Sequence, residues 1–134
     1  MDIISQADRR ALMSRVRSAN TAPELAIRSM VHRLGFRFRL RRPSLPGKPD
    51  LIFPSRKKVL FVHGCFWHQH EGCKRGRLPR TNVEFWKSKL SENKFRDKRV
   101  ATKLESMGWS TFTVWECELT ERRLAARIVR FLRA

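Results

Sequence analysis

Apolar residues recur along the chain with the spacing of three helices. The first helix is expected to begin at Thr21-Ala22-Pro23-Glu24, because threonine is a favourable N-cap, proline suits the first turn and glutamate completes a capping box. Four apolar residues mark its buried face before Gly35 ends it: Ile27, Met30, Val31 and Leu34. A second helix is expected from about residue 82 to 107, in one or two pieces, and a third after Thr120 as its N-cap. The inward residues of the third helix would be Leu124, Ile128, Phe131 and Leu132.

Short apolar or alternating runs predict four strands. Residues 36–40 alternate between apolar residues and arginine, which is typical of a half-buried strand. Residues 50–53 and 58–62 are joined by a turn at 54–57, and the second run is continuously apolar, as in a central strand. Residues 111–115 form the fourth strand. This order of elements predicts a single-domain α/β fold, with a mixed central sheet flanked by helices.

The charge of the chain indicates a polyanionic partner. Its 134 residues include 30 Lys and Arg against 12 Asp and Glu, which gives a net charge of +18. Such an excess repels itself unless a polyanion offsets it, so nucleic acid is the first expectation and an anionic membrane surface the second. Arginine outnumbers lysine, 21 to 9, which favours phosphate and base-edge contacts.

Other features of the sequence restrict its class and its location. The longest apolar run, residues 59–62, is too short to span a bilayer, and the first residues lack the pattern of a signal peptide. Three cysteines, an odd number, do not suggest a disulfide framework. We therefore expect a cytoplasmic protein whose cysteines bind metal or stay buried as thiols. Residues 1–20 are expected to form an arm or a weak helix ahead of the main domain, 21–134.

A set of cysteine and histidine residues predicts a metal site. Cys65, His70 and Cys73 lie in one polar loop, and Cys117 follows 44 residues later at the end of a strand. Three thiolates and an imidazole suit tetrahedral Zn²⁺, and a closed set of four protein ligands makes such a site structural. His68 could replace His70 in this set. Three unrelated buried cysteines are the alternative.

Acidic and histidine residues meet at the predicted hairpin of strands. Asp50 begins one strand and His63 ends the next, so the two side chains can be neighbours, with His68 shortly after. A carboxylate at a strand end can bind Mg²⁺, and a histidine can accept a proton from water. Glu24 is a candidate outer carboxylate. The alternatives are a turn cap for Asp50, a core histidine for His63 and a capping box for Glu24.

Large aromatic residues accompany these groups. Phe66 and Trp67 lie in the basic loop, and Trp86 lies early in the long helix. Such side chains can stack on bases or wedge between them. Packing onto the core is the alternative.

Five motifs in order resemble one family, the very-short-patch-repair (Vsr) DNA mismatch endonucleases. They cover nearly the whole chain, and the string His63-Gly64-Cys65-Phe66-Trp67-His68 is highly specific. The other matching stretches are Thr21-Ala22-Pro23-Glu24, Leu45-Pro46-Gly47-Lys48-Pro49-Asp50, Glu84-Phe85-Trp86 and Val114-Trp115-Glu116-Cys117. The resemblance implies a fold related to type II restriction endonucleases. It also implies nicking of double-stranded DNA 5′ of the thymine in a T:G mismatch, which arises by deamination of 5-methylcytosine.

The resemblance also implies a role for each candidate residue. Asp50 and the main-chain carbonyl of Val62 would hold Mg²⁺, Glu24 and His63 would act through waters on that ion, and His68 would be the base. A structural zinc would be held by Cys65, His70, Cys73 and Cys117. The aromatic wedge inserted into the DNA would consist of Phe66, Trp67 and Trp86. Residues 1–20 would grip DNA, and residues 21–134 would form the endonuclease domain with its zinc-stabilised loop.

Two functions therefore stand beside each other at this point. The first is a monomeric, Mg²⁺-dependent mismatch endonuclease associated with the nucleoid. The second is a zinc-stabilised nucleic-acid-binding protein without catalysis. A binding protein needs the charge, the aromatic residues and the zinc, but it has no need of Asp50 and His68 together.

Overall fold

Three strands form a mixed sheet at the centre of the molecule. The structure, a computed structural model, describes residues 21–68, 70, 73 and 77–134. The strands, in the order in which they pair across the sheet, are β1 (Leu51–Phe53), β2 (Lys58–His63) and β3 (Ser110–Trp115). β1 pairs antiparallel with β2, whereas β3 pairs parallel with it. The apolar strand 58–62 is therefore central, as its composition predicts.

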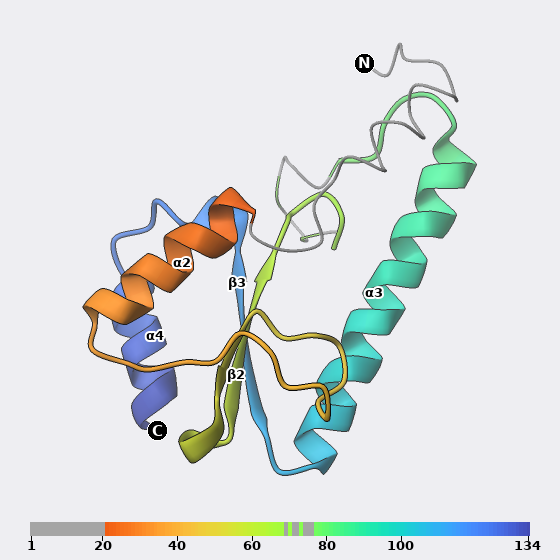
Figure 1. Ribbon diagram of the computed structural model, residues 1–134. Helices are drawn as coiled ribbons and strands as arrows, with labels where there is room; N and C mark the ends of the chain where they lie inside the picture. The colour runs from red at the N-terminus through yellow and green to blue at the C-terminus, as the bar shows by residue number, and fades with distance from the viewer. Residues whose placement is uncertain (1–20, 69, 71–72, 74–76) are drawn as a thin grey trace.

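Helices cover the sheet on two sides (Figure 1). The helices are α2 (Ala22–Arg33), α3 (Val83–Ser106) and α4 (Leu124–Arg133). α2 and α4 lie on one side of the strands, and α3 lies on the other. This arrangement confirms a small single domain of α/β class with a mixed, helix-flanked sheet. Among the described residues, no helix combines the length and the apolar character needed to cross a membrane.

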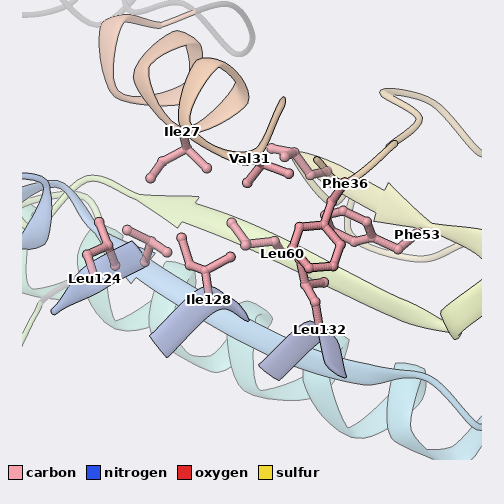
Figure 2. Packing of buried hydrophobic residues seen from close by; sticks show 10 residues of the cluster. Ile27, Val31, Phe36, Phe53, Leu60, Leu124, Ile128 and Leu132 are labelled. Atoms are coloured by element: carbon pink, nitrogen blue, oxygen red, sulfur yellow. The ribbon is translucent and has the colours of Figure 1, made fainter. Parts of the chain in front are cut away.

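The larger part of the core lies between the sheet and the pair α2 and α4. In Figure 2, Ile27 of α2 and Ile128 of α4 approach Leu60 of β2 from their two helices. Met30, Leu34 and Phe131 pack against this cluster from its margin, so the predicted inward faces of both helices are confirmed. The remaining buried members are Val31, Phe36, Leu51, Phe53, Val114, Leu124 and Leu132.

A second core cluster lies between the opposite face of the sheet and the C-terminal half of α3. Alternate residues of the same strands supply it, because successive side chains of a strand point to opposite faces. Its buried members are Leu45, Ile52, Val59, Phe61, Leu104 and Trp109. The helix is thus held firmly at one end, and its N-terminal half reaches toward the carboxyl ends of β2 and β3 (Figure 1).

Two predicted details of secondary structure are wrong. Residues 36–40 form no strand; Arg39 alone makes an isolated bridge, to Ile52. β1 offers little else to pair with, because Pro49 and Pro54 flank it and have no N–H to donate. Thr120 does not cap the last helix either: turns occupy residues 119–120 and 122–123, and α4 begins after Arg123.

The prediction of the long helix and that of the Thr21 N-cap are confirmed. The long helix is one continuous piece, and Thr21 accepts a hydrogen bond from the Glu24 N–H as the N-cap of α2 (3.4 Å). The expected N-terminal arm, 1–20, lies outside the described residues.

Candidate active site and metal-binding cluster

The residues assigned to zinc lie together at the carboxyl ends of β2 and β3. One ligand atom from each of four residues lies within 4.8 Å of the others: Cys65, His70, Cys73 and Cys117. We call this group the cysteine–histidine cluster. Within it, Cys117 Sγ lies 3.4 Å from His70 Nδ1. The structure brings His70 to the cysteines, whereas His68 points into a different group described below.

The register of the two parallel strands explains this meeting. His63, the last residue of β2, is the partner of Trp115, the last residue of β3. Two residues beyond each of them lie Cys65 and Cys117, at the same edge of the sheet. The main-chain N–H of Cys65 donates to Glu116 Oε1 at 3.3 Å, which links the two loops directly.

The chemistry of the cluster fits a bound cation. Burial, followed by hydrogen bonding to Cys65, raises the pKa of the Cys117 thiol to about 12 without a metal. Burial also raises the pKa of the Cys65 thiol. Protein without a cation therefore holds these groups as thiols, whereas a soft divalent ion would stabilise the thiolate form. Three sulfur atoms and one imidazole nitrogen are a donor set that fits Zn²⁺.

Asp50 lies directly before β1 and faces the central strand. Its N–H donates to the Leu60 carbonyl at 3.1 Å, and its Oδ2 accepts the Val62 N–H at 2.6 Å. Burial is the main cause that raises the pKa of Asp50 to about 6; the Val62 hydrogen bond opposes this shift, and the nearby charge of Glu24 contributes to it. A bound cation would stabilise the ionised form of a carboxylate in this position, since its charge compensates for the lost solvation.

Glu24 reaches the same region from the first turn of α2. Its side chain is buried, and its Oε2 lies 3.4 Å from an Arg28 guanidinium nitrogen. The charges of both residues act on the pKa of Asp50 in opposite directions. The structure therefore brings Glu24 and Asp50 together, although they are 26 positions apart in the sequence.

His63 and His68 lie face to face. Their ring centroids are 3.8 Å apart and their planes differ by 7°. Burial, followed by the proximity of His68, lowers the pKa of His63 to about 4, so this imidazole is neutral at neutral pH. His68 Nδ1 lies 2.6 Å from Asp97 Oδ2 of α3. We call His63, His68 and Asp97 the histidine–aspartate cluster; one ligand atom from each lies within 4.8 Å of the others.

Asp97 is a candidate site residue that the sequence analysis missed. It lies at the middle of α3, far along the chain from the other groups. Its signal is its position: Leu90, Asp97 and Leu104 follow at seven-residue intervals and share one helix face. Both leucines are buried, so an acid between them is directed at the rest of the protein rather than at solvent. The Asn93 side chain, one turn earlier, donates to the Trp67 carbonyl at 3.1 Å and ties the same face to the loop.

The three residues assigned to the wedge form one aromatic cluster. Phe66 lies edge to face with Trp67 and with Trp86, at centroid distances of 5.2 and 5.5 Å. Phe66 and Trp67 are partly exposed, whereas Trp86 is buried. The exposed neighbour of Trp86 is Phe85, 5.2 Å away. Phe66 and Trp67 thus form the accessible part of the cluster, and buried Trp86 packs against both of them.

Comparisons with known proteins identify the family of this chain. A sequence model of the family described as DNA mismatch endonuclease Vsr matches residues 1–75. The type II nicking enzyme V.XorIIP of Xanthomonas oryzae pv. oryzae is 52% identical over 120 residues, which are 90% of this chain and 88% of that protein. The DNA mismatch endonuclease Vsr of Escherichia coli (strain K12) is 38% identical over 121 residues, 90% of this chain and 77% of that protein. The chain therefore belongs to the Vsr family of DNA mismatch endonucleases.

Proposed function

We propose that this DNA endonuclease nicks one strand 5′ of the thymine in a T:G mismatch, in a reaction that depends on Mg²⁺. The observation that carries the proposal is the hydrogen-bonded pair of His68 and Asp97, 2.6 Å apart, near the partly buried carboxylate of Asp50. This combination of a base, a group that orients the base and a metal-binding carboxylate suits hydrolysis of a phosphodiester.

Asp50 and the main-chain carbonyl of Val62 would hold the Mg²⁺. Both groups offer oxygen ligands, one directly before β1 and the other on β2, and the Val62 N–H already donates to the Asp50 carboxylate. Glu24 and His63 would orient waters on the ion. When bound, the ion supplies positive charge that polarises the phosphodiester and stabilises the charge developing on it.

His68 would accept the proton of the attacking water. With Nδ1 hydrogen-bonded to Asp97, the favoured tautomer carries its proton on Nδ1 and leaves the lone pair on Nε2. Asp97 then stabilises the imidazolium that forms when Nε2 takes the proton. Asp97 is therefore a positioning residue in this proposal, since it acts through His68.

The remaining groups would recognise the substrate and hold the loop. Zn²⁺ on the cysteine–histidine cluster would order the segment that carries Phe66, Trp67 and His68. Phe66 and Trp67 would wedge into the DNA at the mismatch, with Trp86 joining them. Basic residues would contact the phosphates, with residues 1–20 as a gripping arm ahead of the endonuclease domain, 21–134.

The proposal extends to fold class, assembly and place of action. We infer a fold related to type II restriction endonucleases, supported by a mixed sheet with the metal-binding carboxylate beside its central strand. The enzyme would act as a monomer in the cytoplasm, at the nucleoid, because its substrate is chromosomal DNA. The alternative, a zinc-stabilised binding protein without catalysis, has no use for the pair of His68 and Asp97.

A nicking assay tests the proposal. Duplexes containing one T:G mismatch with randomised flanking bases, and the matched T:A and C:G duplexes, are incubated with protein in Mg²⁺ or in EDTA. Nicking 5′ of the mismatched thymine, only with Mg²⁺, is the expected result. Equal cutting of matched DNA would indicate a nuclease without mismatch specificity, and binding without nicking would favour the alternative.

Substitutions in the same assay separate catalysis from binding. Asp50→Asn keeps the side-chain volume but removes the anionic ligand, so nicking should fall by several orders of magnitude while DNA affinity holds or rises. Asp97→Asn should lower turnover but leave mismatch affinity unchanged. Turnover of Asp50→Asn at the wild-type rate would exclude the metal-binding role of Asp50.

A further inference from the structure

The histidine–aspartate cluster has the composition of a metal site in its own right. It draws one residue from the end of β2, one from the loop that follows, and one from α3. Two imidazoles and one carboxylate whose ligand atoms lie within 4.8 Å of one another differ in kind from the oxygen donors offered by Asp50 and Val62. No part of the proposed nicking reaction needs a metal ion at this position.

One ring nitrogen of the histidine–aspartate cluster makes no hydrogen bond to the described residues. His63 Nδ1 is buried and has no hydrogen-bond partner among the residues that the structure describes. A buried polar atom without a partner costs free energy, so a ligand that binds to it is favoured. The ring of His68 lies stacked against His63, and Asp97 lies against His68, so two further donors are within reach.

We infer that His63, His68 and Asp97 form a second metal site that takes Zn²⁺ or a similar late transition-metal ion in preference to Mg²⁺. Imidazole nitrogen suits zinc, cobalt, nickel and copper, whereas Mg²⁺ prefers oxygen ligands and keeps its waters. The site is distinct from the cysteine–histidine cluster, because none of its ligands is shared. The ion would replace the hydrogen bond between His68 Nδ1 and Asp97 Oδ2.

Binding of one ion by all three residues requires their side chains to rearrange. Zinc–nitrogen and zinc–oxygen bonds of about 2.0–2.2 Å place neighbouring tetrahedral ligand atoms roughly 3.4 Å apart. The 2.6 Å contact of His68 and Asp97 must therefore open by under an ångström. The lone pair of an imidazole nitrogen lies in the ring plane, so His63 or His68 must also rotate about its side-chain bonds until the two rings are no longer parallel.

Occupancy of this site would inhibit the proposed reaction. An ion on His68 Nδ1 leaves the remaining ring proton on Nε2, so Nε2 has no lone pair for the attacking water. Zinc would therefore have two opposite effects: the first equivalent stabilises the loop, and the second blocks the base. The inhibitory part rests on the proposed function, whereas the binding part does not.

Metal binding is measured on the full chain already loaded with one equivalent of zinc. Equilibrium dialysis against Co²⁺ in the presence of excess Mg²⁺ should show one further ion bound. Its absorption should lack the thiolate-to-cobalt band, because this site has no sulfur ligand. His63→Ala and Asp97→Asn should each weaken the second ion at least 10-fold. His32→Ala is the matched control, since His32 is exposed on α2, and should leave both ions in place.

Three results would overturn the inference. These are binding of only one equivalent by the wild-type protein, unchanged binding of the second ion by both His63→Ala and Asp97→Asn, and loss of the second ion in Asp50→Asn instead. Retention of the first zinc in each variant shows that the fold persists around the site. The dialysis needs no nicking activity, so a failure of the proposed function leaves its result unaffected. In the nicking assay, zinc beyond one equivalent should inhibit, and a chelator that removes only the weaker ion should restore the rate.

Discussion

The indole of Trp115 stacks on the imidazole of His70, with ring centroids 4.3 Å apart and planes within 10°. The same indole meets the His63 ring nearly edge to face at 5.2 Å. Trp115 therefore lies between the cysteine–histidine cluster and the histidine–aspartate cluster, and contacts both. It contacts a proposed zinc ligand on one side and a proposed active-site histidine on the other.

Replacement of Trp115 should loosen both clusters. Trp115→Ala removes the surface on which His70 rests, so we expect zinc affinity to fall about 10–100-fold, as is typical when support of a ligand is lost. Trp115→Phe keeps an aromatic face and should retain most of the affinity. Zinc retention against a competing chelator measures the difference. Equal retention by the two variants would show that the stacking does not support the site.

Two histidines only two residues apart should respond differently to replacement. His68→Ala should leave a folded protein with one equivalent of zinc, normal DNA binding and very little nicking, because a proton acceptor alone is lost. His70→Ala should lower the zinc content and the Tm, so that activity falls through loss of structure. Zinc content and Tm of the two purified variants decide the assignment. Zinc lost from His68→Ala and kept by His70→Ala would exchange the two roles.

The stability of the metal-free protein should depend on Asp50 and on pH. Burial raises the pKa of Asp50 from its ordinary value of 3.8 to about 6. The unfolded chain therefore ionises this carboxyl at a lower pH than the folded protein does, and folding is disfavoured as pH rises from about 4 through 6. In metal-free protein at pH 8, Asp50→Asn should raise the free energy of unfolding by at most about 3 kcal/mol. The Tm should rise accordingly.

The same comparison has two internal controls. Well below pH 3.8, the Tm difference between wild type and Asp50→Asn should shrink, because the carboxyl is then mostly protonated in both states. Added Mg²⁺ should raise the Tm of the wild-type protein but not that of Asp50→Asn. A wild-type protein more stable than the variant at pH 8 without metal would contradict the raised pKa.

Phe66 and Trp67 should contribute to mismatch recognition. Replacement of both by Ala removes the accessible part of the aromatic cluster, and each lost stacking contact costs on the order of 1–3 kcal/mol. Affinity for T:G duplexes should thus fall far more than affinity for matched duplexes, with unchanged salt dependence, since no phosphate contact is lost. Phe95→Ala is the control, because Phe95 is exposed on α3 outside the cluster. Equal losses on both duplexes would mean that the pair serves packing.

Local patterns in the sequence were sufficient for most of the fold. The helical spacing of Ile27 and Val31 and the apolar run of the central strand are signals carried by near neighbours, and both were predicted correctly. The strand at 36–40 was wrong for the opposite reason. Its alternation is real, since Phe36 is buried while Arg37 is exposed, but a strand also needs a partner, and β1 is too short to supply one.

The sequence by itself determined which chemistry the protein carries: the thiols, the imidazoles, the carboxylate of Asp50 and the excess of positive charge. Only the tertiary structure decided which of these groups meet. The parallel register of β2 and β3 brings Cys65 to Cys117, and the packing of α3 brings Asp97 to His68. Such contacts join residues far apart in the chain, so no local spacing encodes them. These contacts follow from the burial of apolar faces on both sides of the sheet, which positions the strands and helices relative to one another.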